Sequence, residues 1–484
     1  MKSIVISSNS SGGGKTTTTV GLMRALMKMN YDVQGYKVGP DYIDTAFHSF
    51  ITKKPSRNLD LFLIGEEGVM EVYSRGTGDL GVIEGVMGLY DGKGINSKYS
   101  TAHVAKVLDL PVVLVLSPKA QSATLGAEIQ GLLNYCDEFV KDVNIKGIIL
   151  NNISPSYYNL LKLVIENCTS LKVYGYIPKD ERLSLESRHL GLVQAGEIGD
   201  LENKIEICSE YILKNVDVKS LLEDFKENHV IDKYKEQIIP NEKHLKPIAF
   251  SEERATIGDK KGKFNMKNHN LRIGVAKDVA FSFYYRENLE LLSEIGEVVY
   301  FSPLLDEKLP EDLEFLYIGG GYPEVFVKEL SQNKSMLSSI KEALEQGLPC
   351  YAECGGLMYL TEGIAPMNEE MIYETVGFFK GYSYLTKMLQ NFGYAEILID
   401  KENSLVTQGN KINCHEFHKS KVNLEETPVY KVEKTTYNNE VKQWSCGYVK
   451  NNTLAGYGHV HFFNNMEFFR EMINKVLQYK EKKS

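Results

Sequence analysis

The feature that most constrains the fold is a glycine-rich run near the N-terminus, SSNSSGGGKTT at residues 7–17. It follows the apolar residues 4–6 and precedes a helical pattern, which predicts a strand, a loop and a helix in that order. In such a unit, the loop amides and the positive end of the helix dipole bind phosphate oxygens, and a lysine and a threonine complete the site. The expected nucleotide-binding residues are Gly12, Gly13, Gly14, Lys15, Thr16 and Thr17. Asn9 replaces the first glycine of the usual pattern, so the loop is a variant, and a plain strand-to-helix turn is the alternative.

Composition restricts the class of protein. A chain of 484 residues has room for two or three domains. Its formal charge of −9 disfavours nonspecific binding to nucleic acid or to an anionic membrane, because such binding depends on clustered Lys and Arg. The seven cysteines are odd in number and form no C-x-x-C pair, which argues against a disulfide framework and a structural zinc site. The sequence shows neither a long uninterrupted apolar run nor a signal-peptide pattern, so we expect a cytoplasmic enzyme that acts on small molecules.

Short apolar runs alternate with helical segments along most of the chain. In the first half the expected strands are residues 3–7, 33–37, 80–84, 111–116, 146–150 and 172–177. Their spacing leaves room for crossover helices, and apolar residues on both faces are typical of a parallel sheet covered by helices. The alternation resumes with strands at 271–276, 297–301, 314–318 and 348–352. We therefore predict two doubly wound α/β domains, at residues 1–235 and 271–480, joined by a charged linker at 236–270.

Acidic residues lie where two of these strands end. Asp41 and Asp44 follow strand 33–37, and Glu84 is the last residue of strand 80–84. Ligands of doubly wound folds bind beyond the carboxyl ends of the strands, so these carboxylates are candidates for contacts to metal or substrate. An acidic strand end beside a phosphate loop is typical of a Mg²⁺ ligand, which favours Glu84. For the aspartates a second explanation stays open, because a loop aspartate often only caps a helix.

A cysteine in the second half has the surroundings of a nucleophile. Cys354 follows strand 348–352 and precedes two glycines and a helical pattern, as in a nucleophile elbow. The start of a helix is expected to lower the pKa of the thiol. Backbone N–H groups of Gly355 and of the glycine-rich turn at 319–321 could receive an oxyanion. These features predict a reactive thiol at this turn.

Two later segments contain histidines. Residues 456–463 read GYGHVHFF, with His459 and His461 two residues apart. An isolated histidine is more often structural than catalytic, but a thiol nucleophile needs a base, so one of this pair is expected to serve Cys354. The segment CHEFHKS at 414–420 has no partner cluster, which favours substrate contact or structural hydrogen bonding over zinc.

Together these motifs resemble a known family over nearly the whole chain. The first half looks like an ATPase of the dethiobiotin synthetase type, and the second half looks like a class I glutamine amidotransferase with its elbow at 353–356. This order of domains, with VGPDYID at 38–44, EGVMGLYDG at 84–92 and HEFH at 415–418, is similar to the cobyrinate a,c-diamide synthases. Cobyric acid synthases share both domain types but lack, in their family pattern, the first two of these motifs.

The resemblance implies an activity and assigns residues to it. It implies ATP-dependent amidation of the a and c carboxylates of a corrin ring in cobalamin biosynthesis, with glutamine as nitrogen donor and Mg²⁺ as cofactor. The implied glutaminase residues are Cys354 and His459, with Gly320, Gly321 and Gly355 around the oxyanion. Implied substrate contacts are Asp41, Tyr42, Ile43, Asp44 and Asp91, and implied Mg²⁺ contacts are Thr16, Asp41 and Glu84. The expected partners are cobyrinate, L-glutamine and ATP, and a homodimer is one candidate assembly.

The sequence leaves two questions open. The usual third member of the amidotransferase triad is a glutamate two residues after the histidine, and here that residue is His461. A backbone carbonyl, or an Asp or Glu elsewhere, could orient His459 instead. The substrate is the second question, because amidation of Ni-sirohydrochlorin in coenzyme F430 synthesis resembles this family in both domains. A switch ATPase of the same loop superfamily would leave Cys354 and His459 unexplained, and its signature lysine is replaced here by Ser10.

Overall fold

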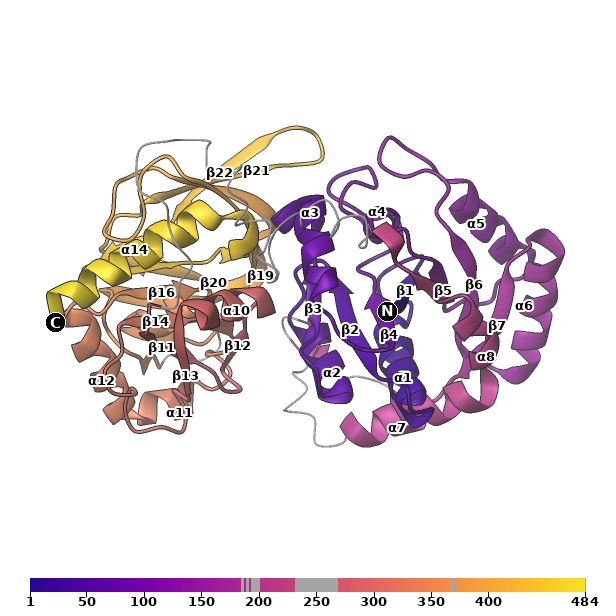
Figure 1. Cartoon of the computed structure of the whole chain (residues 1–484), viewed down its shortest axis with the longest axis horizontal. Coiled ribbons are helices and arrows are strands. Elements are labelled where there is room, and N and C mark those ends of the chain that lie inside the picture. The colour runs from indigo at the N-terminus through magenta and orange to yellow at the C-terminus, as the bar shows by residue number, and fades with distance from the viewer. Residues whose placement is uncertain (184–186, 189–190, 193–200, 231–268, 368–370, 484) are drawn as a thin grey trace. The chain divides into compact units, whose positions relative to one another are not determined.

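The computed structural model describes residues 1–183, 187–188, 191–192, 201–230, 269–367 and 371–483. Contacts within the chain divide it into two compact units, Met1–Ile248 and Ala249–Ser484. Figure 1 follows the chain from indigo at the N-terminus to yellow at the C-terminus. Residues 236–268 of the expected linker lie outside the described residues.

The first unit is built on a parallel sheet with the strand order β3-β2-β4-β1-β5-β6-β7. The strands are β1 (Lys2–Ser8), β2 (Val33–Val38), β3 (Arg57–Leu59), β4 (Leu80–Glu84), β5 (Val112–Leu116), β6 (Ile145–Ile153) and β7 (Lys172–Pro178). In addition, β10 (Lys226–Glu227) runs antiparallel to β1, and β8 (Ser187–Arg188) pairs with β9 (Gly191–Leu192). The six strands predicted for this half are confirmed, whereas the short β3 was not predicted.

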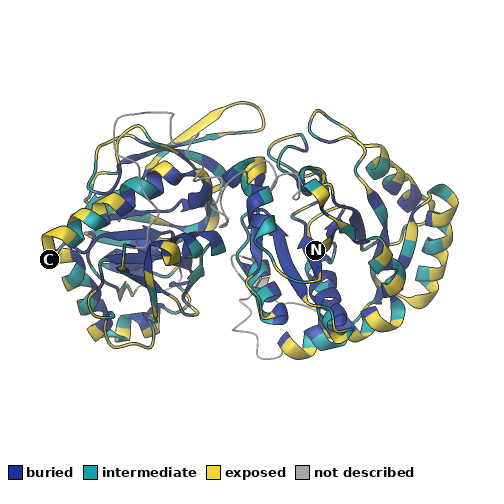
Figure 2. Cartoon of the chain, viewed as in Figure 1, coloured by how far each residue is buried: buried dark blue, intermediate teal, exposed yellow. Residues whose placement is uncertain are grey.

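Helices cover this sheet, and their outer faces are exposed in Figure 2, while the strands between them are buried. They are α1 (Lys15–Lys28), α2 (Ile43–Thr52), α3 (Leu61–Ser74), α4 (Thr101–Val107), α5 (Ala123–Asn134), α6 (Pro155–Cys168), α7 (Leu201–Asn215) and α8 (Val218–Glu223). The sequence VVLVL of β5 is buried at every residue, as a central strand covered on both faces should be. Polar side chains cap the first turn of several helices. Asp60, for example, accepts hydrogen bonds from the N–H groups of Phe62 and Leu63 at the start of α3.

The second unit also has a mainly parallel sheet, with the order β13-β11-β14-β16-β24-β23. Its strands are β11 (Leu271–Ala276), β13 (Gly296–Phe301), β14 (Phe315–Ile318), β16 (Cys350–Glu353), β23 (Tyr448–Lys450) and β24 (Thr453–Gly456). Only the β23–β24 pair of this sheet is antiparallel. The four strands predicted here are confirmed. The helices are α10 (Arg286–Ile295), α11 (Val327–Gln332), α12 (Lys334–Glu345), α13 (Gly355–Leu360) and α14 (Met466–Lys483).

A second large sheet in this unit was not predicted. Its order is β18-β17-β19-β20-β25, with β21 paired to β19 and β22 paired to β21. The strands are β17 (Gly363–Ala365), β18 (Tyr373–Glu374), β19 (Gly381–Ile399), β20 (Lys411–Leu424), β21 (Tyr430–Thr435), β22 (Val441–Cys446) and β25 (His459–Val460). The strand β24 ends at Gly456 in the parallel sheet and β25 begins at His459 in this one. The chain therefore crosses from one sheet to the other within a few residues.

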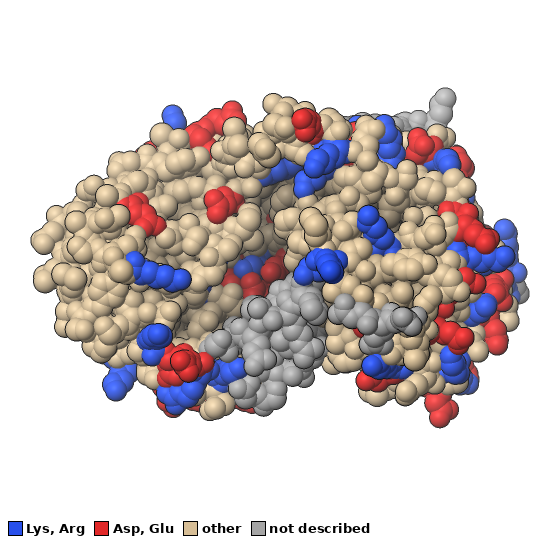
Figure 3. Space-filling view, turned by 180° about the vertical axis from the view of Figure 1, so that it is seen from behind, with Lys and Arg blue, Asp and Glu red and all other residues tan. Residues whose placement is uncertain are grey.

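The surface carries both signs of charge. Acidic and basic side chains are interspersed on the face drawn in Figure 3. Among the described residues, no helix combines the length and the apolar character needed to cross a lipid bilayer.

Candidate active sites

The phosphate loop connects β1 to α1, and its backbone requires glycine. Gly12 and Gly14 have φ angles of 73° and 91°, in the region that residues with a side chain rarely adopt. A Cβ on Gly14 would also lie 2.1 Å from Nδ2 of Asn151. The Lys15 ammonium donates to the carbonyl oxygens of Ser10 at 2.9 Å and Met87 at 2.5 Å, so the side chain folds back along the loop. Burial and the nearby charge of Lys37 lower the pKa of Lys15 to about 8, which leaves it mostly charged at pH 7.

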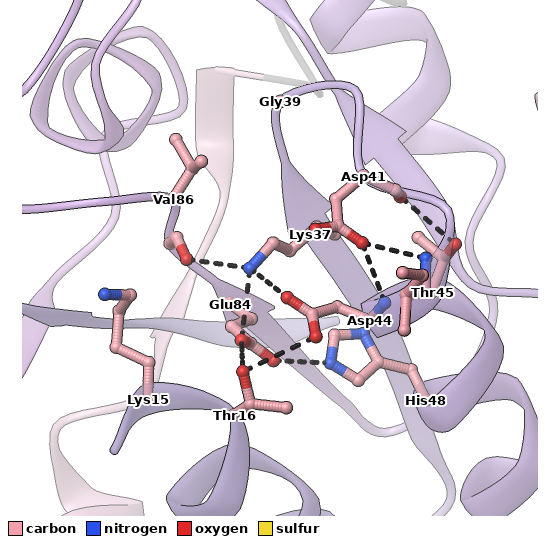
Figure 4. Close-up of polar contacts among 12 residues, drawn as sticks. Lys15, Thr16, Lys37, Gly39, Asp41, Asp44, Thr45, His48, Glu84 and Val86 are labelled. Carbon is pink, nitrogen blue, oxygen red and sulfur yellow. Dashed lines mark hydrogen bonds and ion pairs between the residues drawn. The ribbon is translucent and has the colours of Figure 1, made fainter. Parts of the chain in front are cut away.

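A buried cluster of charges lies beside Thr16 (Figure 4). The Lys37 ammonium, from β2, is 2.5 Å from Oδ2 of Asp44 and 3.1 Å from Oε1 of Glu84. Glu84 also accepts the Thr16 hydroxyl at 2.6 Å, and its other oxygen lies 2.8 Å from Nε2 of His48. Burial by itself would raise the pKa of Glu84, but Lys37 and the hydrogen bonds from His48 and Thr16 hold it well below its usual range. Glu84 is therefore a stable carboxylate at the end of β4.

The two aspartates after β2 have different positions. Oδ1 of Asp41 accepts the N–H groups of Ile43 and Asp44 at 2.8 Å each, so its side chain caps the start of α2. Oδ1 of Asp44 lies 3.4 Å from the Thr16 hydroxyl. Burial, together with the charges of Asp41 and Glu84, raises the pKa of Asp44. Of the two aspartates, Asp44 is therefore the one that lies beside Thr16 and shares the Lys37 ammonium with Glu84.

The remaining predicted substrate residues lie at the same edge of the sheet but differ in exposure. Ile43 is 8% exposed, so its side chain belongs to the core. Tyr42 is half-buried, and Asp91 is exposed, with Oδ2 accepting the Gly88 N–H at 2.8 Å. Asp91 also contributes to the electrostatic field at Lys15. No group of three or more His, Cys, Asp and Glu side chains among the described residues has the arrangement of a metal cluster.

Two members of the charged cluster were missed by sequence reasoning. Lys37 lies in β2, a strand whose residues are all buried, and a lysine within such an apolar run could have been recognised as a paired internal charge. His48 lies four residues after Asp44 on α2, which places both side chains on one face of the helix. Both side chains contact Glu84, which is far from them in the sequence, so the sequence did not indicate this shared partner.

The second centre begins at Cys354, in the sharp turn between β16 and α13. Its backbone angles, φ 49° and ψ −102°, are strained for a residue with a side chain. Its N–H donates to the carbonyl of Gly456 at 2.7 Å, which fixes the turn against β24. Only glycine fits at 356, because a Cβ there would lie 2.3 Å from the Ile318 carbonyl oxygen. The backbone therefore has the sharp strand-to-helix turn that the sequence predicts, and the role of Cys354 as nucleophile stays a prediction.

The expectation of a lowered thiol pKa is wrong for this geometry. Burial raises the pKa of Cys354 well above its usual value, and the charges of Glu324 and Glu416 raise it further. The Gly355 N–H acts in the opposite direction, but its contribution is smaller than that of burial. The thiol is therefore protonated at neutral pH, and a base must remove its proton before it can act as a nucleophile.

Glu353 connects the elbow to His459. Its Oε1 accepts the Val460 N–H at 3.1 Å, and its Oε2 accepts the Tyr317 hydroxyl at 3.1 Å and lies 3.7 Å from Nδ1 of His459. Both side chains of this contact are almost completely buried. In the sequence, Glu353 is recognisable only as part of the elbow motif, and the partner of His459 could not be identified. Position 353 lies before the nucleophile, whereas the familiar triad glutamate follows the histidine.

The predicted oxyanion residues lie around the same pair. Gly320 and Gly321 form β15, which pairs with β12 (Phe281–Phe283). A Cβ on Gly320 would lie 2.4 Å from Cε1 of His459, and a Cβ on Gly355 would lie 3.1 Å from the backbone nitrogen of Gly321. The three glycines therefore allow the turn after β14, the elbow and the histidine to approach closely.

The other histidines have structural partners. Nε2 of His461 lies 3.4 Å from Oε2 of Glu287 on α10. The His418 ring stacks on Tyr457 at 3.8 Å, and its Nε2 lies 3.1 Å from Oε2 of Glu416. His415 is opposite His459 in the β20–β25 pair, and burial and the charge of His459 lower its pKa to about 3. These contacts fit the structural hydrogen bonding expected for the segment at 414–420.

Comparisons with known proteins match both units. Residues 4–193 match the family described as CobQ/CobB/MinD/ParA nucleotide binding domain, and residues 272–467 match the CobB/CobQ-like glutamine amidotransferase domain. A cobyrinate a,c-diamide synthase of Clostridium tetani is 62% identical over 475 residues, covering 98% of this chain and 100% of the relative. One of Clostridium acetobutylicum is 57% identical with the same coverage, and one of Caldanaerobacter subterraneus is 41% identical over 96% of each chain.

Proposed function

The chain belongs to the cobyrinate a,c-diamide synthase family, and we propose that it uses glutamine and ATP to convert the a and c carboxylates of cobyrinate into amides. One observation carries the proposal: a single chain combines a phosphate loop beside buried carboxylates with a strained cysteine elbow beside a histidine–glutamate pair. The first centre can activate a carboxylate, and the second can release ammonia.

The first centre is suited to phosphoryl transfer. A carboxylate resists attack by ammonia, so the γ-phosphoryl group of ATP is transferred to one of its oxygens, giving an acyl phosphate and ADP. Lys15 neutralises charge on the phosphates, and its pKa of about 8 keeps it charged at neutral pH. The oxygens of Thr16, Asp44 and Glu84 are the hard donors that Mg²⁺ prefers, and the bound ion would neutralise phosphate charge. Asp41 positions α2 in this proposal, and its expected contacts with Mg²⁺ and with the macrocycle stay predictions. The macrocycle contacts of Tyr42, Asp44 and Asp91 stay predictions as well.

The second centre is suited to glutamine hydrolysis. His459 removes the proton of the Cys354 thiol, and the sulfur attacks the side-chain amide carbon of glutamine. Backbone N–H groups among Gly320, Gly321 and Gly355 receive the oxyanion, and His459 returns the proton as ammonia leaves. Water then hydrolyses the thioester to glutamate and the free thiol. In this proposal Glu353 is the group that orients His459, which the 3.7 Å separation between its Oε2 and Nδ1 of His459 supports.

Ammonia then attacks the acyl phosphate, forming the amide and releasing phosphate. The proposed function is tested by incubating the protein with ATP, Mg²⁺ and glutamine, together with either cobyrinate or Ni-sirohydrochlorin. Mass spectrometry should show two successive replacements of a hydroxyl by an amino group on cobyrinate. If only Ni-sirohydrochlorin is amidated, that ring and not cobyrinate is the substrate. If neither ring is amidated, the proposed function is contradicted. Association into a homodimer stays a prediction, which sedimentation of the full chain can test.

A further inference from the structure

Two lysines face each other across the β21–β22 hairpin in the second unit. Lys434 on β21 is directly opposite Lys442 on β22 in the antiparallel register. Like charges in this position destabilise a sheet. A lysine on an exposed edge strand such as β22 discourages aggregation, but the half-buried Lys434 on the inner strand needs a different explanation. Burial and the charge of Lys442 lower the pKa of Lys434, while the charge of Glu416 acts in the opposite direction with a smaller effect.

The two lysines line a cavity of about 470 Å³. The rest of its described lining consists of two aromatic and three polar residues: Phe392, Trp444, Asn391, Thr436 and Gln443. The lining therefore has two ammonium groups and no carboxylate. Such a cavity has the charge to bind an anion and the apolar surface to bind a flat, weakly polar body.

Each of the two aromatic residues of the lining has a polar contact with the protein. The Trp444 indole N–H donates to Oε1 of the buried Glu416 at 3.1 Å, which fixes the ring from the protein side. Phe392 is 50% exposed, and its carbonyl oxygen accepts the Lys434 ammonium. Three further apolar side chains of the same elements are exposed, namely Met388 on β19, Tyr437 in the turn of the hairpin and Val441 on β22.

We propose that this cavity binds one edge of a planar, polycarboxylated macrocycle, the chemical class to which cobyrinate belongs. Lys434 and Lys442 pair with peripheral carboxylates, and Phe392 and Trp444 contact the face of the ring. The inference rests on the proposed function for the identity of the ring. ATP has its own site in the phosphate loop of the first unit, and glutamine offers no flat apolar surface for the aromatic pair. A polycarboxylated ring satisfies both the charge and the apolar lining.

Trp444 makes a direct test feasible because it is the only tryptophan of the chain. The full-length protein is titrated with cobyrinate, without ATP or glutamine, while tryptophan fluorescence is recorded. We expect saturable quenching, with a Kd that rises about tenfold or more in Lys442→Gln and in Lys434→Gln, as the loss of a charged pair predicts. Lys431→Gln is the matched control, since Lys431 lies on β21 but pairs with Glu433 and does not line the cavity. Its Kd should equal that of the unmodified chain.

A second probe separates charge from stacking. A corrin whose peripheral carboxylates are all amides should bind more weakly than cobyrinate, and with equal affinity to the unmodified chain and to Lys442→Gln. Because Lys442 is exposed, its substitution is not expected to disturb folding, and glutamine hydrolysis by the variant reports that the unit is intact.

The outcomes distinguish this inference from the proposed function. If the chain amidates cobyrinate but Lys442→Gln binds it with unchanged Kd, the cavity proposal is overturned and the function stands. If cobyrinate is neither bound nor amidated, the proposed function fails, and the same titration is repeated with Ni-sirohydrochlorin. Binding of that polycarboxylated ring that depends on Lys442 supports the cavity, and absent or Lys442-independent binding overturns it.

Discussion

The two candidate centres are assembled in different ways. The residues of the first centre lie at the carboxyl edge of one parallel sheet, on or directly after the neighbouring strands β2, β4 and β1. They are Lys15, Thr16, Asp44 and Glu84. In the second unit, Cys354 follows a strand of the parallel sheet, whereas His459 lies on β25, which pairs with the second sheet. The first arrangement follows from the rules of doubly wound folds, and the second depends on where the chain changes sheets.

The centres also differ in the state of their charges. At the first centre, Lys37 and the hydrogen bonds from His48 and Thr16 hold Glu84 as a carboxylate, so this buried charge pair is in place before a ligand arrives. At the second centre burial keeps the Cys354 thiol protonated, so a proton must move before reaction. The first centre therefore contains charge that is already present, whereas the second must create it during the reaction. Three experiments test this difference.

The largest effect is expected for Cys354→Ser. Glutamine-dependent amidation should fall by about three orders of magnitude or more, because the nucleophile is lost. Amidation supported by an ammonium salt should continue, since the first centre is intact. Product formation with each nitrogen donor is the measurement, and Cys136→Ser, at an exposed thiol, is the control. An equal loss of amidation with glutamine and with the ammonium salt would contradict the assignment of separate reactions to the two centres.

A smaller effect is expected for Glu353→Gln. An amide in place of the carboxylate cannot stabilise the positive imidazole of His459, so kcat for glutamine hydrolysis should fall about 10²- to 10⁴-fold. Glu353→Asp keeps the negative charge and should retain more activity. Ammonia-dependent amidation should not change in either variant, and Glu345→Gln at an exposed helix position serves as control. Unchanged glutamine hydrolysis in Glu353→Gln would exclude this residue as the orienting group.

The smallest effect concerns the pH dependence of ATP binding. The pKa of Lys15 is lowered from 10.5 to about 8, so the free protein loses this positive charge as pH rises through 8. Affinity for a non-hydrolysable ATP analogue should decrease up to about tenfold between pH 7 and pH 9, following the protonated fraction. Calorimetric titration measures the Kd at each pH. In Lys15→Arg the charge persists and the profile should be flat; a flat profile in the unmodified chain would contradict the assignment.

Much of the first centre was accessible from the sequence. The spacing from strand to glycine loop to lysine fixes a local unit, and Glu84 at a strand end could be placed beside it by topology alone. The choice between Asp41 and Asp44 could not be made in this way. Both follow β2, and only the start of α2 decides that Asp41 caps the helix while Asp44 turns toward Thr16.

Less of the second centre was accessible. The elbow at Cys354 has a local signature, but the second sheet was missed because buried positions of its strands are not all apolar. In β20 they include Glu416, His418 and Ser420, so neither an apolar run nor an apolar–polar alternation marks the strand. Without that sheet, the positions of His415 opposite His459, and of the lysine pair on the hairpin, could not be foreseen. The raised pKa of the thiol was also hidden, since burial depends on everything packed around the turn.

The sequence alone determined the groups that local spacing defines: the phosphate loop, the elbow and the parallel strands that carry them. The tertiary structure decided which distant groups pair, namely Lys37 with Asp44 and Glu84, and Glu353 with His459. The physical reason is that strand and turn geometry depends on a few neighbouring residues, whereas the pairing and protonation of buried charges depend on the surrounding residues from many elements, which exclude water.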